Sequence, residues 1–456
     1  MKQWLPSFFM AYTRARRSQH KKLKVGPPVV LAGGFFVLIL FGALLLKLPF
    51  ATVEPITWLD SLFTAASAVT VTGLVVVDTG QAYTPFGLTV IAMLIQTGGI
   101  GFMTFAILAV MSMGGNIGIS YQLVAREAMQ QTSLKNIAKT ARTVFYLALI
   151  VELLGTVVLT LTWWGEFGFW RALGEAAFYS ISAFNNAGFG LSANSLSDYV
   201  GSIPVNLVVT FMFIVGGLGF SVLMNIFEKR RWNQFSVYTR SILIATLLIN
   251  ILSAFIFWLL EHSNPDTLGS LSTLQQTLAS WFQATTPRTA GFNTVDIGQL
   301  REPTSMYIML LMFIGGGSMS TGGGIKLGTF IVLMMATYAF LRRRQHVTLM
   351  QRSIEQQMVM KALAVSMITL LMAFLGIFFL MILNPLPFID VSFEVLSALA
   401  TVGLSRGITG ELTEVSQILV IILMFAGRVG PLTLVYFLTT PHRKRVRYPK
   451  TEVQVG

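Results

Sequence analysis

The chain has 456 residues, of which 54% are hydrophobic and only 11% are charged. Because an average soluble domain carries roughly 25% charged residues, this composition excludes an ordinary soluble protein and predicts one that lies in a lipid bilayer. The sequence has no cysteine and four scattered histidines, which excludes disulfides and thiolate metal sites. The formal net charge of +13 does not indicate a nucleic-acid partner, because the basic residues are divided among short clusters between apolar runs.

Long uncharged apolar runs predict helices that span the membrane. Val29 to Leu46, Ser241 to Leu260 and Ala362 to Asn384 approach or reach the ~20 residues that cross a hydrocarbon core of ~30 Å. The first run is expected to be a permanent span rather than a signal segment, because 28 residues precede it and no small-residue cleavage site follows it cleanly.

Basic clusters between the apolar runs predict which segments face the cytoplasm. Most of the Lys and Arg residues fall in five clusters, and segments rich in these residues are retained inside. The clusters are residues 2–24, 126–142, 229–240, 342–361 and 443–450. Both termini are therefore expected in the cytoplasm, and most acids, from Glu54 to Glu411, fall in the outer loops. The unequal distribution of acidic and basic residues has two interpretations. The acidic outer loops raise the local concentration of cations at the entrance of a pathway, or the charges only determine the orientation of the chain in the membrane.

A short pattern recurs along the chain and indicates an internal repeat. It reads D/E-x-x-F-x-x-x-S-A, with a glycine and then Leu or Phe beginning five residues after the alanine. The complete copies start at Asp60, Glu175 and Asp390 and end at Gly73, Gly188 and Gly403. A degenerate copy, with Leu278 in place of the acid and Trp281 in place of the Phe, ends at Gly291.

Each copy lies between two apolar runs but is too short to cross a membrane itself. Only 13 residues separate the acid from the glycine, so a helix of that length must enter the bilayer and return. Non-helical backbone at this depth needs protein or water to satisfy its polar groups, which predicts that the four loops converge on one aqueous path. Close packing of small residues between helices explains a single copy, but not the recurrence.

The expected fold is an all-α integral membrane protein of four tandem units. Each unit has a spanning helix, a short pore helix with a re-entrant loop, and a second spanning helix. Eight transmembrane helices and four pore loops are expected to surround a central pore in a pseudo-fourfold arrangement. The expected segments are a cytoplasmic N-terminal segment (1–27), unit one (28–112), unit two with its preceding cytoplasmic loop (113–228), unit three (229–341), unit four (342–440) and a cytoplasmic C-terminal tail (441–456).

The glycine loops are the candidate selectivity filter. A filter points successive carbonyl oxygens at an ion that has lost its water, and glycine permits the backbone angles that this requires. The short helix before each loop also directs its partly negative C-terminal end toward the membrane centre, which favours a cation. The candidate residues are Thr70, Val71, Thr72, Gly73, Asn185, Asn186, Ala187, Gly188, Arg288, Thr289, Ala290, Gly291, Ala400, Thr401, Val402 and Gly403. The expected ion ligands are the backbone carbonyls of Thr72, Ala187, Ala290 and Val402.

A glycine cluster follows each filter loop. Gly98 to Gly101 and Gly216 to Gly219 are interpreted as helix-packing sites. In the third unit the charge-poor stretch from Pro303 to Leu341 is too long for one simple span, and its glycines destabilise a helix. The helix is expected to break at Gly315, Gly316, Gly317, Ser318, Met319, Ser320, Thr321, Gly322, Gly323 and Gly324. This loop is the candidate gate, with a packed kink that does not move as the alternative.

Three ionisable residues fall inside predicted spans, where a charge costs ~2.5 kcal/mol or more unless it faces water or a partner. Arg428 is expected to point into the pore and to belong to the gate. Lys326 is either a second pore-facing cation or a group that extends to the cytoplasmic surface. Glu152 either binds a coupling ion or ties two helices together.

The repeated copies and their glycine loops resemble those of the bacterial Ktr/Trk and plant HKT superfamily of potassium transporters, and the Ktr-type membrane subunit within it. The resemblance extends from Pro28 to about Leu438. It implies a potassium-translocating subunit in the inner membrane of a bacterium, with K⁺ as the transported ion, Na⁺ as an activating ion and no covalent cofactor. Because serine in place of the first filter glycine accompanies sodium preference in some plant members, Gly73 favours potassium. The resemblance also implies gating by the glycine-rich loop and Arg428.

The resemblance further implies partners. They are a second copy of the chain in a homodimer, membrane lipids, and a cytosolic RCK-type ring of regulatory subunits that bind nucleotide; no nucleic acid is expected.

Two other functions are considered. A secondary transporter with inverted repeats would alternate the orientation of its copies, whereas the pore helices predicted here begin on the outer side. A membrane enzyme would need a His, Cys or paired-carboxylate centre at membrane depth, and none is visible in the sequence.

Overall fold

The computed structural model describes residues 27–101, 104 and 137–430, which are mainly helical. The helices form four units, each with a long first helix, a short helix that ends in a loop, and a second helix. The first helices are α2 (Pro27–Leu46), α8 (Ile137–Phe167), α12 (Val237–Glu261) and α16 (Gln356–Leu383). The short helices are α3 (Trp58–Thr70), α9 (Phe169–Phe184), α13 (Thr273–Thr285) and α17 (Phe388–Ala400). The second helices are α5 (Pro85–Ile100), α10 (Ile203–Leu218), α14 (Glu302–Phe313) and α18 (Glu414–Val429).

Smaller elements complete the described chain. They are α4 (Thr79–Ala82), α11 (Phe220–Lys229), α15 (Leu327–Leu341), the 3-10 turns η1 (Ser197–Tyr199), η2 (Trp232–Gln234) and η3 (Thr409–Glu411), and the strands β1 (Thr348–Leu349) and β2 (Arg352–Ser353). The strands form an antiparallel hairpin whose turn residues, Met350 and Gln351, both have positive φ, as a two-residue type I′ turn requires. The described chain is helical, as expected, and the sequence did not predict this short hairpin between α15 and α16.

Four described helices are long and apolar enough to cross a membrane. They contain the segments Val29–Leu46, Ala141–Phe167, Val237–Glu261 and Gln356–Leu383, and a bent pair, α10 and α11, makes a fifth if it is counted as one span. The three runs singled out in the sequence lie in α2, α12 and α16. The outward side chains of these helices are apolar and exposed, as with Leu154 on α8 and Phe374 on α16, each 64% exposed. Such a surface suits a hydrocarbon solvent.

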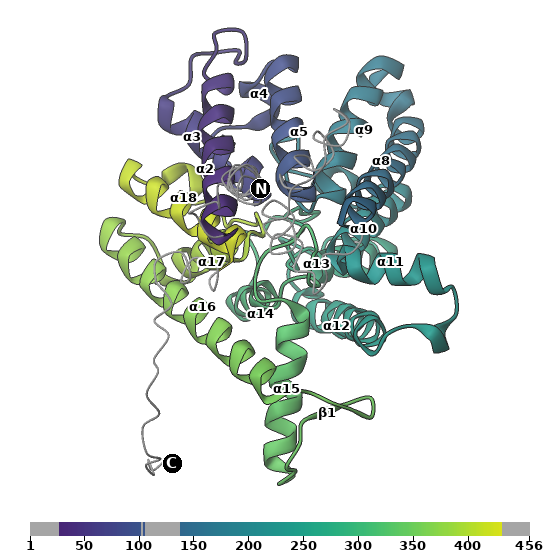
Figure 1. Ribbon diagram of the computed structural model, residues 1–456. Coiled ribbons are helices and arrows are strands. Elements are labelled where there is room, and N and C mark those ends of the chain that lie inside the picture. The colour runs from purple at the N-terminus through teal and green to yellow at the C-terminus, as the bar shows by residue number, and fades with distance from the viewer. Residues whose placement is uncertain (1–26, 102–103, 105–136, 431–456) are drawn as a thin grey trace, which may run out of the picture.

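The units pack in a closed cycle. The second helix of each unit packs against the short helix of the next unit, and the last unit packs in this way against the first. The pairs are α5 with α9, α10 with α13, α14 with α17, and α18 with α3. Figure 1 shows this order as a colour sequence that runs around the molecule until the yellow α17 and α18 lie beside the purple α2 and α3. The ends of the four short helices are thereby placed near a common centre.

The starts of the short helices differ in their distance from the repeated acid position. In α3 the side chains of Thr57 and Asp60 form a capping box, which satisfies two of the free N–H groups at the helix start. In α13 the same box is made by Ser272 and Gln275, so this helix begins well before Leu278, the residue aligned with the acid. The expectation that Glu175 starts a pore helix is wrong, because α9 begins at Phe169.

The second helices end at glycines. Gly101, Gly219 and Gly430, with φ of 91°, 95° and 93°, end α5, α10 and α18, and the chain turns by 94° between α10 and α11. The packing interpretation of the first two clusters is correct for Gly98 and Gly216, where a Cβ would lie 2.0 and 1.9 Å from a carbonyl oxygen at the end of the unit's own short helix. It is incomplete, because three residues later the helix ends.

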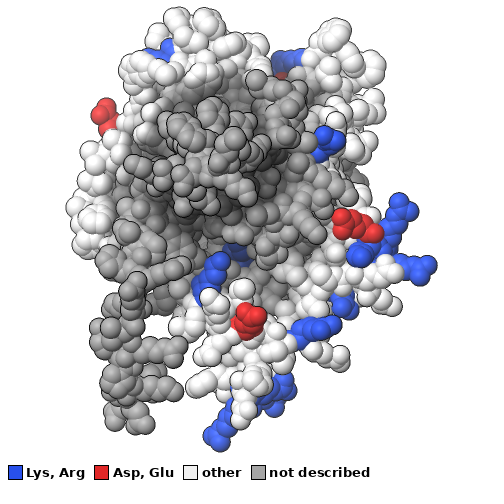
Figure 2. Space-filling view, viewed as in Figure 1, with Lys and Arg blue, Asp and Glu red and all other residues white. Residues whose placement is uncertain are grey.

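Many of the basic side chains gather at one end of the described structure (Figure 2). Figure 2 shows most of the blue Lys and Arg atoms over the loop that follows α11 and around α15 and the hairpin. These are the places where the basic clusters 229–240 and 342–361 lie. The clusters at residues 2–24, at 443–450 and in most of 126–142 fall outside the described residues.

Candidate functional site

The four filter glycines face one another in a ring. Each glycine approaches the carbonyl oxygen of the residue before the glycine in the next loop so closely that a Cβ would come within 3.0 Å of it. The distances from such a Cβ are 2.3 Å for Gly73 to Ala187 O, 3.0 Å for Gly188 to Ala290 O, 2.4 Å for Gly291 to Val402 O and 2.1 Å for Gly403 to Thr72 O. The order of the contacts follows the chain and closes from the fourth loop to the first. The structure thus brings together the four carbonyl groups proposed from the sequence as ion ligands.

All four loops share one backbone conformation. The filter glycines have φ between 69° and 96°, and the residue two positions earlier also has a positive φ in every loop. These earlier residues are Val71, Asn186, Thr289 and Thr401, with φ of 58°, 59°, 81° and 50°. Side chains disfavour this region, so its fourfold occurrence marks a conformation that the surrounding structure imposes.

The serine of the repeated pattern holds the loop. The hydroxyl of Ser67 accepts a hydrogen bond from the N–H of Gly73 at 3.0 Å, and Ser397 accepts one from Gly403 at 3.1 Å. Both serines lie in the last turn of a short helix. Sequence reasoning identified these serines only as part of a pattern and missed the role, although their constant distance from the glycine was the available signal.

The first residues of the loops point away from the ring. Thr70 donates from its hydroxyl to Ala66 O at 2.7 Å, within its own helix. Arg288 donates from Nη1 to Oδ1 of Asn250, on α12, at 3.0 Å, and is only 8% exposed. The Thr70 hydroxyl also lies 2.8 Å from Oγ1 of Thr72, in its own loop. These side chains therefore connect the loops to the helices before and around them.

The chain leaves the helix between Phe313 and Leu327, a stretch that includes the break predicted at residues 315–324 and is slightly longer. The ends of this loop are joined where Gly315 donates to Ile325 O at 2.9 Å, and Gly317 donates to Gly217 O, in the neighbouring unit, at 2.8 Å. We call residues 314–326 the gate loop. Its ends are therefore anchored by backbone hydrogen bonds.

The tip of the gate loop contacts the filter loops. A Cβ on Gly322 would lie 2.0 Å from Oγ1 of Thr289, and one on Gly323 would lie 2.1 Å from Oγ1 of Thr401. The hydroxyl of Thr321 donates to Oδ1 of Asn186 at 2.8 Å. The tip therefore lies against three residues that directly precede the carbonyl ring, where only glycine leaves enough space.

Two cations hold the gate loop. Arg428 donates to the carbonyls of Thr321 and Gly98, and to that of Gly99 at 3.1 Å. Lys326 donates from Nζ to Gly322 O at 2.5 Å. Both line a cavity of about 690 Å³ on the side of the gate loop away from the filter. Arg428 and Lys326 therefore both bind backbone carbonyls of the gate loop.

Glu152 has partners that the sequence did not identify. Its carboxylate accepts hydrogen bonds from Gln96, on α5, at 2.9 Å and from Asn185, at the end of α9, at 3.1 Å. It therefore connects three helices from two units, directly behind the second filter loop.

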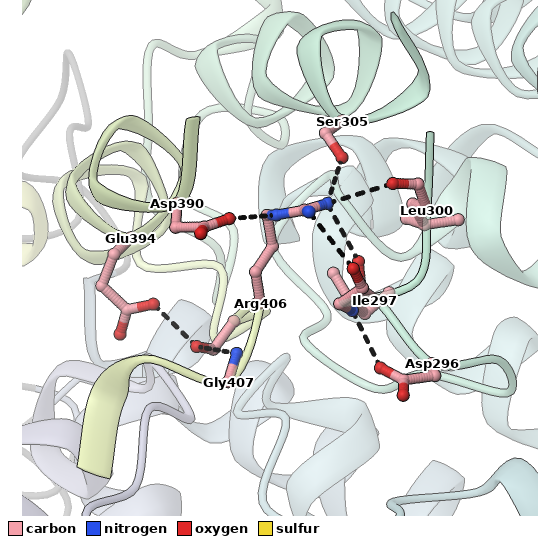
Figure 3. A network of polar contacts seen from close by, with 10 residues as sticks. Asp296, Ile297, Leu300, Ser305, Asp390, Glu394, Arg406 and Gly407 are labelled. Atoms are coloured by element: carbon pink, nitrogen blue, oxygen red, sulfur yellow. Dashed lines mark hydrogen bonds and ion pairs between the residues drawn. The ribbon is translucent and has the colours of Figure 1, made fainter. Parts of the chain in front are cut away.

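A network of polar contacts centres on Arg406, which follows the fourth filter loop two residues after Leu404. Figure 3 shows its guanidinium between the Asp390 carboxylate and several oxygen acceptors of the third unit. It forms an ion pair with Asp390 at 2.5 Å and donates to Oγ of Ser305 at 2.6 Å, and its other acceptors are the carbonyls of Ile297, Gly298 and Leu300. Beside it, Glu394 accepts from Ser405 and Thr409 at 2.7 and 2.6 Å. Sequence reasoning missed Arg406, because a single arginine next to a filter loop carries no repeat signal.

The chain matches known proteins over most of its length. The TrkH family model, described as a cation transport protein, matches residues 35–241 and 229–448. The chain is 47% identical over 436 residues to the Ktr system potassium uptake protein B of Bacillus subtilis (strain 168), covering 96% of this chain and 98% of that protein. It is 33% identical over 442 residues to the potassium/sodium uptake protein NtpJ of Enterococcus hirae, covering 95% and 98%.

A solved structure shares the fold. The potassium transporter TrkH from Vibrio parahaemolyticus superposes with a TM-score of 0.71 at 22% sequence identity, covering 94% of this chain and 88% of that chain. The family model and the two relatives extend over nearly the whole sequence. The chain therefore belongs to the TrkH family of cation transport proteins.

Proposed function

We propose that this chain is the membrane subunit through which potassium enters a bacterial cell. The closed ring of four glycine loops, in which the carbonyls of Thr72, Ala187, Ala290 and Val402 meet, carries the proposal. Carbonyl oxygens in a ring can replace the water around a cation that has been stripped of its hydration shell. An inside-negative membrane potential supplies ~2.3 kcal/mol per charge per 100 mV for inward movement.

The proposed architecture has eight transmembrane helices and four re-entrant pore loops, in four pseudo-equivalent units around the ring. The cyclic packing of second helices on short helices supports this arrangement. The proposed boundaries are 28–112, 113–228, 229–341 and 342–440, with cytoplasmic segments 1–27 and 441–456 in a multi-pass inner-membrane protein. The second helices have 12 to 16 residues, fewer than the ~20 that cross a membrane. In the proposed architecture, each second span therefore also includes the segment that follows the end of this helix.

The gate loop is the proposed barrier on the ion path. Its tip lies against the residues that precede the ring, and two cations hold it there. A cation that leaves the filter must pass this loop, so conduction requires that the loop move. Arg428 then has two roles, because it binds the loop and repels cations from the cavity.

The proposed ions are K⁺ as cargo and Na⁺ as an activator. Names of relatives support both, since one is called a Ktr system potassium uptake protein and another a potassium/sodium uptake protein. The proposed partners are a second copy of the chain, membrane lipids, and a cytosolic nucleotide-binding RCK-type ring. The dimer and the cytosolic ring follow from the resemblance to the Ktr-type membrane subunit.

The substitution Gly73→Ser tests the filter. A serine Cβ would lie 2.3 Å from Ala187 O, and the φ of 96° disfavours any side chain. In bacteria that lack other potassium uptake, we expect rubidium entry to fall more than sodium entry. The control is Gly33→Ser, because nothing lies within 4 Å of a Cβ at Gly33. Rubidium uptake that is indifferent to Gly73 in a properly inserted protein would place the ion path elsewhere.

A further inference from the structure

A buried carboxylate lies behind the second filter loop. Glu152, near the middle of α8, is 6% exposed. One carboxylate oxygen accepts from Nε2 of Gln96 at 2.9 Å, and the other accepts from Nδ2 of Asn185 at 3.1 Å. Moving a carboxylate from water into a protein interior costs free energy, and hydrogen bonds compensate only part of it. A neutral residue at this position would avoid that desolvation cost.

The carboxylate and Gln96 fix the orientation of the Asn185 side chain. Its Nδ2 faces three acceptors, namely Oε1 of Gln96 at 2.6 Å, Oε1 of Glu152 and the carbonyl of Ile181 at 2.9 Å. If the amide were reversed, its oxygen would face acceptors only. Oδ1 of Asn185 faces Gly99, where a Cβ would lie 2.1 Å from it, and it is buried without a hydrogen-bond partner among the described residues. The Asn185 amide therefore has one orientation.

The second filter loop lacks the support that two other loops have. In the first and fourth loops a serine hydroxyl accepts from the filter glycine. The corresponding hydroxyl, that of Ser182, is buried and has no hydrogen-bond partner among the described residues. Asn185 caps α9 and is followed by Asn186, with φ of 59°, and by Ala187 of the carbonyl ring. The contacts of Asn185 with Glu152 and Gln96 thus give this loop side-chain support at its start, one residue before Asn186, which accepts from Thr321.

We propose that Glu152 is a positioning residue for cation discrimination. Through the amide of Asn185, and together with Gln96, it holds the second filter loop in the conformation that places the Ala187 carbonyl in the ring. The inference rests on the proposed function and adds a specificity-determining residue that does not touch the ion. It assigns the carboxylate to the filter and not to a separate site for a coupling ion.

Three variants separate the hydrogen bonds from the charge. Gln96 and Asn185 donate to different carboxylate oxygens, and Glu152→Gln replaces one of these two acceptors with an NH2 donor, so one of the two bonds is lost while the side chains stay in place. Gln96→Leu removes both the bond that Gln96 donates to Glu152 and the bond that it accepts from Asn185, and it keeps the carboxylate. The double variant Gln96→Glu with Glu152→Gln exchanges the two groups, so that a carboxylate and an amide oxygen again accept from Asn185. The control is Glu166→Gln on the same helix, where the carboxylate accepts from the Tyr199 hydroxyl at 3.0 Å, far along α8 from Glu152.

The measurement is the ratio of rubidium to sodium entry into bacteria that lack other potassium uptake, with the full-length chain quantified in the membrane. We expect Glu152→Gln and Gln96→Leu to lower the ratio by about tenfold, as the loss of one charge-assisted hydrogen bond would. The exchanged double variant should regain most of it, and Glu166→Gln should leave it unchanged. A tie between helices alone would change the amount of inserted protein and not the ratio.

The outcomes are distinguishable. Wild-type chain that transports no rubidium contradicts the proposed function. Wild-type chain that transports rubidium, with an unchanged ratio in inserted Glu152→Gln, overturns only the role of Glu152. If Glu152→Gln does not reach the membrane, Gln96→Leu becomes the deciding variant, because it keeps the charge of Glu152. An unchanged ratio of rubidium to sodium entry in Gln96→Leu overturns the proposal. A double variant that inserts but stays at the single-variant ratio also overturns it.

Discussion

The hydroxyl of Thr321 donates a hydrogen bond to Oδ1 of Asn186 at 2.8 Å, which joins the gate loop of the third unit to the filter loop of the second. Asn186 directly precedes Ala187, whose carbonyl belongs to the ring. Movement of the gate loop therefore removes a contact from the filter itself. We expect loop position and ion occupancy to influence each other's equilibria, because linkage between two sites is reciprocal.

Thr321→Val should increase ion flux. The substitution removes the hydroxyl and keeps the shape, and one hydrogen bond is worth ~0.5–1.5 kcal/mol, or about twofold to tenfold in the population of the released loop. Rubidium uptake per inserted protein measures the change. The control is Thr337→Val, where the lost hydroxyl donates only within its own helix, to Leu333 O. Flux equal to or below that of the wild type would contradict the proposal that the Thr321 hydrogen bond holds the gate loop closed.

Deletion of residues 318–320 should increase flux further. The shortened loop keeps its backbone anchors at Gly315 and Gly317 but can no longer bring Gly322 against Thr289. Rubidium uptake reports the flux, and the melting temperature in detergent reports whether the protein is folded. A folded deletion variant with unchanged or lost uptake would mean that this segment is a packed kink and not a gate.

Arg428→Gln should raise uptake several-fold. The change removes a fixed positive charge from the cavity and weakens the grip on Thr321 O and Gly99 O. Electrostatic repulsion in a low-dielectric passage acts on every cation, so rubidium and sodium entry should rise together. Lys361→Gln serves as the comparison, since this residue lines the same cavity but is exposed. If both variants transport like the wild type, the cavity charge does not limit conduction.

Arg406→Met should destabilise the protein. Its guanidinium and the Asp390 carboxylate are only 11% and 18% exposed, and leaving one partner of such a pair alone costs ~3 kcal/mol. We expect a clear fall in the melting temperature in detergent and a smaller fall for Arg406→Met combined with Asp390→Asn. Arg171→Met is the control, because Arg171 pairs with Glu175 while 69% exposed, and such a pair contributes ~0.3–0.5 kcal/mol. Equal effects at the two arginines would contradict the role of the buried network.

The recurring glycine loops could be predicted from the sequence because each is a local pattern repeated at regular intervals. The break in the third unit could also be predicted, since glycine-rich backbone does not hold a helix. The partners of Glu152 and Arg406 could not, because they come from other units and depend on how the units pack. The helix ends at Gly101 and Gly219 were missed for a different reason. A single glycine is compatible both with close packing and with a turn, and the sequence does not distinguish the two.

The ring of carbonyls is built from one continuous chain. In an assembly of four identical subunits, every substitution would appear at four symmetric places, and a carboxylate behind one loop would stand behind all of them. Among the described residues, Glu152 lies beside the second loop, the gate loop lies in the third unit, and Arg406 follows the fourth loop. A substitution in such a chain changes one quarter of the ring and not all four, and its effect on the other quarters passes through named contacts between units, such as that of Thr321 with Asn186.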